Sequence, residues 1–453
     1  KNMENKLENV IKKFDSYDYY VKGKIARDTE EYRKGQFALT FTDGEGNPLD
    51  GVTYKVKQVS HEFNFGSTTF WLGGFDDAEK NAEYEKRFTD LFNYAVLPLY
   101  WDTLEPERGK PRFGKDSVHI NRRPPFDTSV EFCVKNGLRM KGHCLVYNSF
   151  QPDWIPEDTR ELKILIEKRV SEIAERYGNS FVDMDVINEM ITIYKNAYPG
   201  NGKRDMSISD EPDHEKWAFE LAKKYFPHTR LFWNEGGFET FGHPDYRGFR
   251  SFYYMALKDN IGKGAPIGGI GMQYHCYSDR DNADTKLAYL CNPLRILDVL
   301  ERYGDFGLPI HISEINIPSW SNDPEDEALQ AELTERLYRL WFSQKNVTSA
   351  VWWNLADNTA YGGENRYHGG LIRHDCTPKP AYEALDRLIN REWRTETDGK
   401  TDKRLDFRGF YGDYEVEAVC GDKKAKTTVR LYTDNTGYDN KFLEFRSKKI
   451  VLK

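Results

Sequence analysis

The chain lacks the sequence features that mark several classes of protein. Its six cysteines form no CxxC pair and do not cluster with histidine, so they indicate neither a disulfide framework nor a zinc site. No apolar run approaches the ~20 residues that a membrane-spanning helix needs. No block of lysine or arginine is long enough to indicate nucleic-acid binding, and the net charge is only −8 over 453 residues. We therefore expect neither a membrane span nor a nucleic-acid partner.

The first 20 residues also lack the apolar region of a secretory signal. They are polar and amphipathic, so any signal peptide has been removed or never existed. We expect a secreted, periplasmic or cell-surface protein, with an intracellular location left open. The oligomeric state is left open as well.

Eight short apolar runs alternate with amphipathic segments between residues 60 and 392. The runs are HEFNFG (61–66), NYAVLPLYW (93–101), LRMKGHCLVY (138–147), FVDMDVINE (181–189), RLFWNE (230–235), IGGIGMQYH (267–275), PIHISEINI (309–317) and SAVWWNLAD (349–357). Helical periodicity is clear in the gaps, for example at Leu329, Leu333, Leu337 and Leu340. This alternation predicts an α/β fold, a (β/α)₈ TIM barrel, with a doubly wound open sheet as the weaker alternative.

The two flanks of this region have a different pattern. Residues 36–60 and 405–453 alternate apolar and polar positions around Gly- and Pro-rich turns, which is typical of antiparallel strands. We expect a small accessory β-module built from both ends of the chain. The predicted division is an N-terminal helix and module strands at 1–60, a catalytic barrel at 61–395, and further module strands at 396–453.

Polar and aromatic residues collect at the carboxyl ends of the eight predicted strands, where a TIM barrel carries its active site. The set is Trp101, His143, Tyr147, Asn188, Glu189, Asn234, Glu235, Gln273, His275, Glu314, Asn316, Trp352, Trp353 and Asp357. Glu189 and Glu314 end the fourth and seventh strands, which face each other across a barrel mouth. Facing carboxylates are what glycoside hydrolysis requires, and a retaining mechanism places them ~5–5.5 Å apart.

The neighbours of the two glutamates suggest different roles for them. Asn188 precedes Glu189 and is placed to hydrogen-bond a sugar hydroxyl such as the 2-OH. His275 lies one or two strands from Glu314, and its imidazole would keep that carboxylate ionised and oriented, as a nucleophile needs.

Five motifs in chain order make the sequence resemble glycoside hydrolase family 10, whose best-known members are retaining endo-β-1,4-xylanases. They are KGHCLVYNSFQPDWI (141–155), DVINEM (185–190), GIGMQYH (269–275), HISEIN (311–316) and AVWWNLAD (350–357). The resemblance implies that Glu189 is the acid/base and Glu314 the nucleophile. It further implies a sugar site formed by His143, Asn188, Gln273 and His275 with Trp353 as a stacking floor, and no metal or organic cofactor.

The sequence also departs from the family pattern at several positions. Many members carry Asn-Glu-Met-Lys-Trp on the second strand, where this chain has VLPLYWDTLEPERG with Leu97, Pro98 and Tyr100 in place of the polar residues that hold the sugar. Tyr147 and Asn148 replace a Trp-His pair, Asn316 replaces an aspartate, and Tyr361 replaces a loop tryptophan. We therefore expect a retaining enzyme acting on a xylan-type polysaccharide or oligosaccharide, and the alternatives are another β-glycoside, a decorated or exo substrate, or a non-catalytic carbohydrate-binding barrel.

Four aromatic or acidic positions admit two interpretations each. Trp101 either lines the site or packs in the core, and Glu235 either supports the nucleophile or starts a turn. Trp352 and Trp353 are neighbours on a strand and so face opposite ways, one toward the barrel wall and the other, which we take to be Trp353, toward the pocket.

Overall fold

The computed structural model describes residues 4–191, 207–237, 240–241, 246–433 and 446–453, and its centre is a closed barrel of eight parallel strands. The barrel strands are β3 (Asn64–Thr68), β4 (Tyr94–Pro98), β5 (Arg139–Tyr147), β6 (Phe181–Asn188), β7 (Arg230–Glu235), β8 (Gly269–His275), β9 (Ile310–Asn316) and β10 (Val347–Trp352). The barrel closes where β10 pairs with β3, with Ala350 beside Phe65. The predicted TIM barrel is confirmed, and the open-sheet alternative is wrong.

Helices follow the barrel strands at the predicted amphipathic segments. The long ones are α3 (Ala78–Leu91), α5 (Phe126–Lys135), α6 (Thr159–Tyr177), α7 (His214–Tyr225), α8 (Phe252–Gly262), α10 (Pro293–Gly304), α11 (Pro324–Ser343) and α12 (Pro380–Arg387). Short ones are α4 (Trp101–Leu104), α9 (Ala288–Leu290), η1 (Ser207–Asp210), η3 (Gly248–Arg250), η4 (Arg280–Asn282), η5 (Ala283–Leu287), η6 (Gly362–Tyr367) and η7 (Leu388–Glu392). Side-chain caps fix several starts: the Asn292 amide oxygen accepts from the backbone N–H groups of Leu294 and Arg295 at the start of α10.

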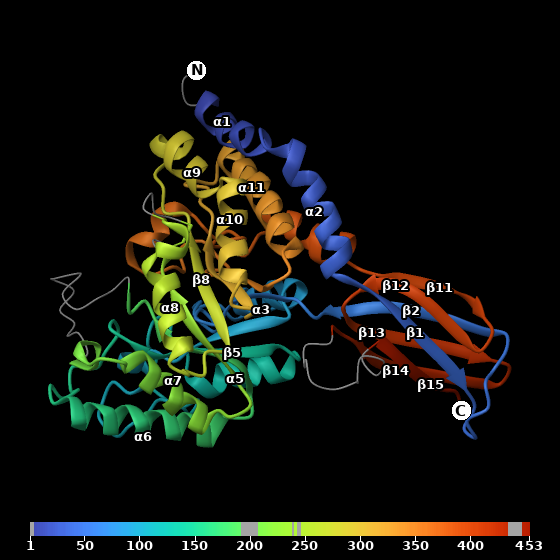
Figure 1. Ribbon diagram of the computed structural model, residues 1–453, viewed down its shortest axis with the longest axis horizontal. Helices are drawn as coiled ribbons and strands as arrows, with labels where there is room; N and C mark the ends of the chain where they lie inside the picture. The colour runs from blue at the N-terminus through green and yellow to red at the C-terminus, as the bar shows by residue number, and fades with distance from the viewer. Residues whose placement is uncertain (1–3, 192–206, 238–239, 242–245, 434–445) are drawn as a thin grey trace.

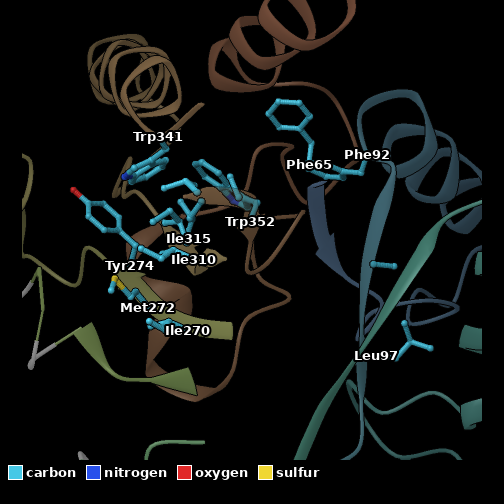
Figure 2. Packing of buried hydrophobic residues seen from close by; sticks show 14 of the residues in the cluster. Phe65, Phe92, Leu97, Ile270, Met272, Tyr274, Ile310, Ile315, Trp341 and Trp352 are labelled. Carbon is cyan, nitrogen blue, oxygen red and sulfur yellow. The ribbon is translucent and has the colours of Figure 1, made fainter. Parts of the chain in front are cut away.

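The barrel wall and the helices around it share one hydrophobic cluster. Figure 2 shows Ile310 and Ile315 of β9 between Trp341 of α11 and the β8 residues Met272 and Ile270, all of them fully buried. Strands covered on both faces read as nearly continuous apolar runs, which is why eight such runs were visible in the sequence.

Strands from both ends of the chain form two further sheets beside the barrel (Figure 1). One contains β12 (Arg404–Phe410), β1 (Lys34–Thr42) and β15 (Ser447–Val451) in that order. The other contains β11 (Glu396–Thr401), β2 (Val52–His61), β13 (Gly412–Cys420) and β14 (Lys423–Leu431). Phe37 lies opposite Phe407 in the first sheet, and the two sheets enclose a hydrophobic cluster distinct from that of the barrel. Residues 434–445 of the predicted module lie outside the described residues.

The two N-terminal helices lie against the barrel and not in the β-module. Helix α1 (Glu4–Asp15) contacts η5, α9 and α11, and α2 (Asp18–Tyr32) runs along α11 before the chain enters β1 (Figure 1). Leu7, Val10 and Phe14 belong to the barrel's hydrophobic cluster. Residues 4–32 therefore pack differently from the rest of the predicted segment 1–60, and the exact domain boundaries stay a prediction.

None of the helices in the described ranges is long and apolar enough to cross a membrane.

Candidate active site

A cavity of about 540 Å³ opens at the carboxyl ends of the barrel strands. Eight of the residues predicted from the sequence line it: Tyr147, Asn188, Glu189, Gln273, His275, Glu314, Trp353 and Tyr361. They come from four barrel strands, β5, β6, β8 and β9, and from the segments that follow β6 and β10. A cavity of this size at this end of a TIM barrel is where the fold holds its ligands.

Glu189 follows β6 with its side chain partly exposed to the cavity. The Tyr147 hydroxyl donates to its Oε2 at 2.6 Å, and Gln273 Nε2 donates to its Oε1 at 2.6 Å. Desolvation of the carboxyl group and the nearby charge of Glu314 nevertheless raise the pKa of Glu189 above its ordinary value. This carboxyl group is thus suited to hold and release a proton.

Glu314 lies in β9 and is 4% exposed. Asn234 Nδ2 donates to its Oε1 at 2.8 Å, and His275 Nε2 lies 3.0 Å from its Oε2. Burial alone would lower the pKa of His275, but the hydrogen bond and charge of Glu314 outweigh it and raise that pKa above its ordinary value. The two nitrogen groups thus hold the Glu314 carboxyl group in a fixed orientation at the cavity.

The backbone is left-handed at both glutamates, with φ of 52° at Glu189 and 55° at Glu314. A residue with a Cβ adopts this conformation only at a cost of about 1–3 kcal/mol, which the surrounding structure must offset. Strain of this kind collects at functional sites, and here it turns both carboxyl groups into the same cavity.

Asn234 links the two glutamates' strands through a chain of amides. Its Oδ1 accepts from Ser313 Oγ at 2.5 Å, which orients its Nδ2 toward Glu314 and toward Asn188 Oδ1 at 2.7 Å. Since Asn188 uses its oxygen in this contact, its amide nitrogen is the group that can donate to a ligand in the cavity.

His143 lies behind the cavity wall in a polar chain that begins inside the barrel. Its Nδ1 is 2.9 Å from Asp185 Oδ2, and Lys141 Nζ is 2.6 Å from the other oxygen of Asp185. A carboxylate oxygen accepts, so we assign the ring hydrogen to Nδ1, and Nε2 faces the Tyr100 hydroxyl at 3.1 Å and Glu314 Oε1 at 4.0 Å. The edge of the His143 ring packs against Trp353.

Three further predicted residues also lie outside the cavity, as His143, Asn234, Trp352 and Asp357 do. Trp101 begins α4, where its indole N–H donates to Glu105 and its ring packs against that of Trp154. Glu235 Oε1 accepts from the backbone N–H of Ile191 and fixes the segment after Glu189. The backbone oxygen of Asn316 accepts from the N–H of Cys276, which ties β9 to the loop after β8.

Other cavity residues were missed because they lie in loops or one step from the strand ends considered. Among them are Phe70, Tyr100, Arg122, Arg123, Phe150, Tyr277 and Glu364. Tyr277, two residues beyond β8, stacks on His275 with ring centroids 4.7 Å apart. There was some indication for Tyr100 in the sequence, because this residue lies in the predicted second strand, where the family pattern is altered. Arg122 and Arg123 lie in a loop whose sequence has no periodic hydrophobic pattern.

Comparisons with known proteins agree with this geometry. The family model described as glycosyl hydrolase family 10 matches residues 76–387. Endo-1,4-beta-xylanase 2 of Arabidopsis thaliana is 26% identical over 422 residues, 90% of this chain and 34% of that protein. Anti-sigma-I factor RsgI6 of Acetivibrio thermocellus is 26% identical over 88% of this chain and 47% of its own. The chain thus spans between a third and a half of the length of these two relatives.

Shorter relatives are matched over most of their length. Endo-1,4-beta-xylanase A of Caldicellulosiruptor saccharolyticus is 28% identical over 65% of this chain and 87% of that protein. Among solved structures, xylanase 10B of Thermotoga petrophila in complex with xylobiose superposes with a TM-score of 0.57 at 21% identity, over 73% of this chain and 95% of that one. At that identity the structural likeness supports the barrel fold alone.

Proposed function

Because the chain belongs to glycosyl hydrolase family 10, we propose that it is a retaining glycosidase that cleaves β-1,4-xylosidic bonds in xylan-type plant polysaccharide. Relatives named as endo-1,4-beta-xylanases support this enzyme class and substrate. The observation that carries the mechanism is the pair of glutamates in one cavity with opposite surroundings: a raised pKa at Glu189, and two nitrogen donors on Glu314.

In the first step Glu314 Oε attacks the anomeric carbon of the sugar and forms a glycosyl ester. The glycosidic C–O bond breaks as Glu189 transfers its proton to the leaving oxygen. Desolvation of Glu189 and the negative charge of Glu314 favour the protonated acid that this step needs.

In the second step the ionised Glu189 takes a proton from water, whose oxygen attacks the anomeric carbon. The ester bond to Glu314 breaks, and two inversions leave the β configuration unchanged. Glu314 loses its charge in the first step and regains it in the second, so the hydrogen bonds from Asn234 and His275 stabilise it as a leaving group.

Time-resolved proton NMR of a linear xylo-oligosaccharide digest tests the proposal. We expect the β-anomer of the new reducing end to appear first and the α-anomer only later by mutarotation; the reverse order would exclude retention. Glu314→Gln should lower kcat by several orders of magnitude while the oligosaccharide still binds, because the substitution removes the nucleophile and keeps the shape of the side chain.

Two observations favour alternatives that the same experiments address. Leu97, Pro98 and Tyr100 stand where the family pattern has polar residues, which supports activity on another or a decorated β-glycoside. One relative is named as an anti-sigma factor, which supports a binding role. Assays on xylans, aryl β-xylosides, β-glucosides and α-arabinofuranosides separate them. Cleavage of another glycoside and of no xylan would favour the first alternative, and binding of these compounds without turnover of any would favour the second. A secreted, periplasmic or cell-surface location stays a prediction.

A further inference from the structure

Two adjacent arginines line the cavity although the proposed chemistry makes no use of them. Arg122 and Arg123 are 6% and 5% exposed. The guanidinium carbon of Arg123 lies 4.2 Å from the ring centroid of Tyr100 and 4.9 Å from that of Phe70. Guanidinium groups stack on aromatic faces because they are weakly hydrated and attracted to the π-system. One wall of the cavity is therefore both aromatic and cationic.

Two side-chain rings separate this wall from the carboxyl group of each glutamate. On one side Tyr100, beneath Arg123, contacts His143 at 3.1 Å, and His143 lies 4.0 Å from Glu314. On the other side the Arg123 guanidinium lies over Phe150, which packs against Tyr147, the hydrogen-bond partner of Glu189. A sugar held at the two glutamates thus has its neighbouring residue or side group within reach of the arginines.

Among the described contacts Arg123 forms no ion pair with a carboxylate, although the charge of Asp102 favours its charged form. Its Nη1 donates to the backbone oxygen of Arg122 at 2.9 Å, and its Nε is buried with no hydrogen-bond partner in that part of the chain. Burial lowers the pKa of Arg123 to about 10, so the side chain is still a cation at neutral pH. A buried cation with an unused donor is unfavourable alone and is stabilised by an anion.

The arginine wall is held rigidly. Arg122 donates to the backbone oxygen of Thr359 at 2.7 Å and to Asn354 Oδ1 at 3.0 Å. Arg112, itself 5% exposed, donates to the backbone oxygens of Thr103, Val118 and Arg123 and so fixes the loop. A cation held in place before the ligand arrives binds it with little further loss of entropy, which a surface arginine does not achieve.

The geometry points to a subsite for a sugar carboxylate, formed by Arg123 with Arg122 as the supporting charge. Resting on the proposed function, the ligand is a uronic acid attached to a xylan chain, as a side group or as a terminal residue. The planar guanidinium matches a carboxylate, whereas a neutral sugar offers only hydroxyl groups. The chain would therefore prefer acidic xylan fragments to neutral ones of equal size.

The test compares a xylo-oligosaccharide that carries one glucuronosyl group with the same compound after its carboxyl group is reduced to an alcohol. The acidic compound should have a kcat/KM roughly 10- to 100-fold higher in the wild-type protein, the range expected for a hydrogen bond to a charged group. A branched and a terminal uronosyl compound are both used, so the arm that shows the preference identifies the source of the carboxylate. Equal rates for both compounds in both arms would overturn the proposal.

Variants assign the preference to the arginine. Arg123→Gln should lower the ratio of kcat/KM for the acidic compound to that for the neutral one by roughly 10- to 100-fold. Arg123→Lys keeps the charge but not the planar guanidinium that can bind both carboxylate oxygens, and it should lower the ratio less. Arg250→Met removes an exposed arginine outside the cavity and should leave the ratio unchanged. If Arg123→Gln lowers the rates on both compounds equally, Arg123 only packs the wall and the inference is wrong.

Calorimetric binding of free D-glucuronate, with D-glucose as the neutral control, separates this inference from the proposed function. Arg123-dependent and salt-sensitive binding of glucuronate would support the subsite even if no xylan were cleaved. Cleavage of neutral xylo-oligosaccharides without any preference for acid would leave the proposed function standing and reject the subsite.

Discussion

The hydrogen bond from Tyr147 to Glu189 makes the proposed acid/base role open to a direct test. Tyr147→Phe removes the hydroxyl that donates to Glu189 Oε2 at 2.6 Å and leaves the ring in place. This bond stabilises the carboxylate more than the protonated acid, and its loss raises the pKa of Glu189 further. The protonated acid therefore persists to higher pH in the variant.

The size of the effect follows from the short bond to a charged group. Hydrogen bonds to charged groups contribute about 1.5–3 kcal/mol, and 1.36 kcal/mol is a tenfold change in the ratio of protonated to ionised acid. At a pH above the alkaline limb, the protonated fraction of Glu189 should rise roughly 10- to 100-fold. Because this limb reports the loss of the proton from the acid, it moves toward higher pH.

The assay is the pH profile of kcat/KM on one xylo-oligosaccharide, each variant normalised to its own maximum so that weaker binding does not affect the comparison. Tyr361→Phe is the matched control, since Tyr361 also lines the cavity but is 51% exposed and is not a partner of either glutamate in the described contacts. Its profile should coincide with that of the wild type. An alkaline limb that stays in place or moves to lower pH in Tyr147→Phe would refute the assignment of Glu189 as the acid.

Three further predictions concern positioning and stability. Asn234→Ala leaves Glu314 without one of its two nitrogen donors and should lower kcat roughly 10- to 100-fold on the same substrate; an unchanged kcat would contradict the role of Asn234. Ile312→Ala, in the fully buried centre of β9, should lower the free energy of unfolding in urea by about 2–5 kcal/mol, whereas Ile164→Ala, 67% exposed, should change it by less than about 0.5 kcal/mol. Asn292→Ala removes the cap of α10 and should lower the same quantity by about 1 kcal/mol, with the exposed Asn322→Ala as a control that leaves it unchanged.

The barrel was predictable because its strands are buried on both faces. Such strands carry apolar residues on both faces, so the apolar residues of GIGMQYH mark β8 and the three isoleucines of IHISEIN mark β9. The β-module was visible for the opposite reason, since its strands alternate, as β12 does with every second residue buried. The packing of α1 and α2 against the barrel could not be read in this way, because an amphipathic helix does not specify which apolar surface it covers.

Within the cavity, position at a strand end predicts which residues meet but not which way each one points. Trp101 and Tyr100 are neighbours at the end of the second strand, and the chain turns into α4 between them. Tyr100 keeps the inward direction of the strand, while Trp101 takes its direction from the helix and packs against Trp154. A prediction based on the ends of the strands alone cannot tell at which residue such a turn begins.

The difference between the two glutamates arises from side chains that are distant in sequence. Tyr147 and Gln273 bind Glu189 from β5 and β8, and Asn234 and His275 bind Glu314 from β7 and β8. Each of these partners lies close to its glutamate only because the parallel strands end on the same side of a closed barrel. The positions of Arg122 and Arg123 do not depend on the strand ends in this way, because hydrogen bonds from Arg112 to the backbone fix their loop. The arrangement of the glutamates thus depends on the barrel, whereas the proposed preference for an acidic sugar would depend on a loop that can vary without disturbing it.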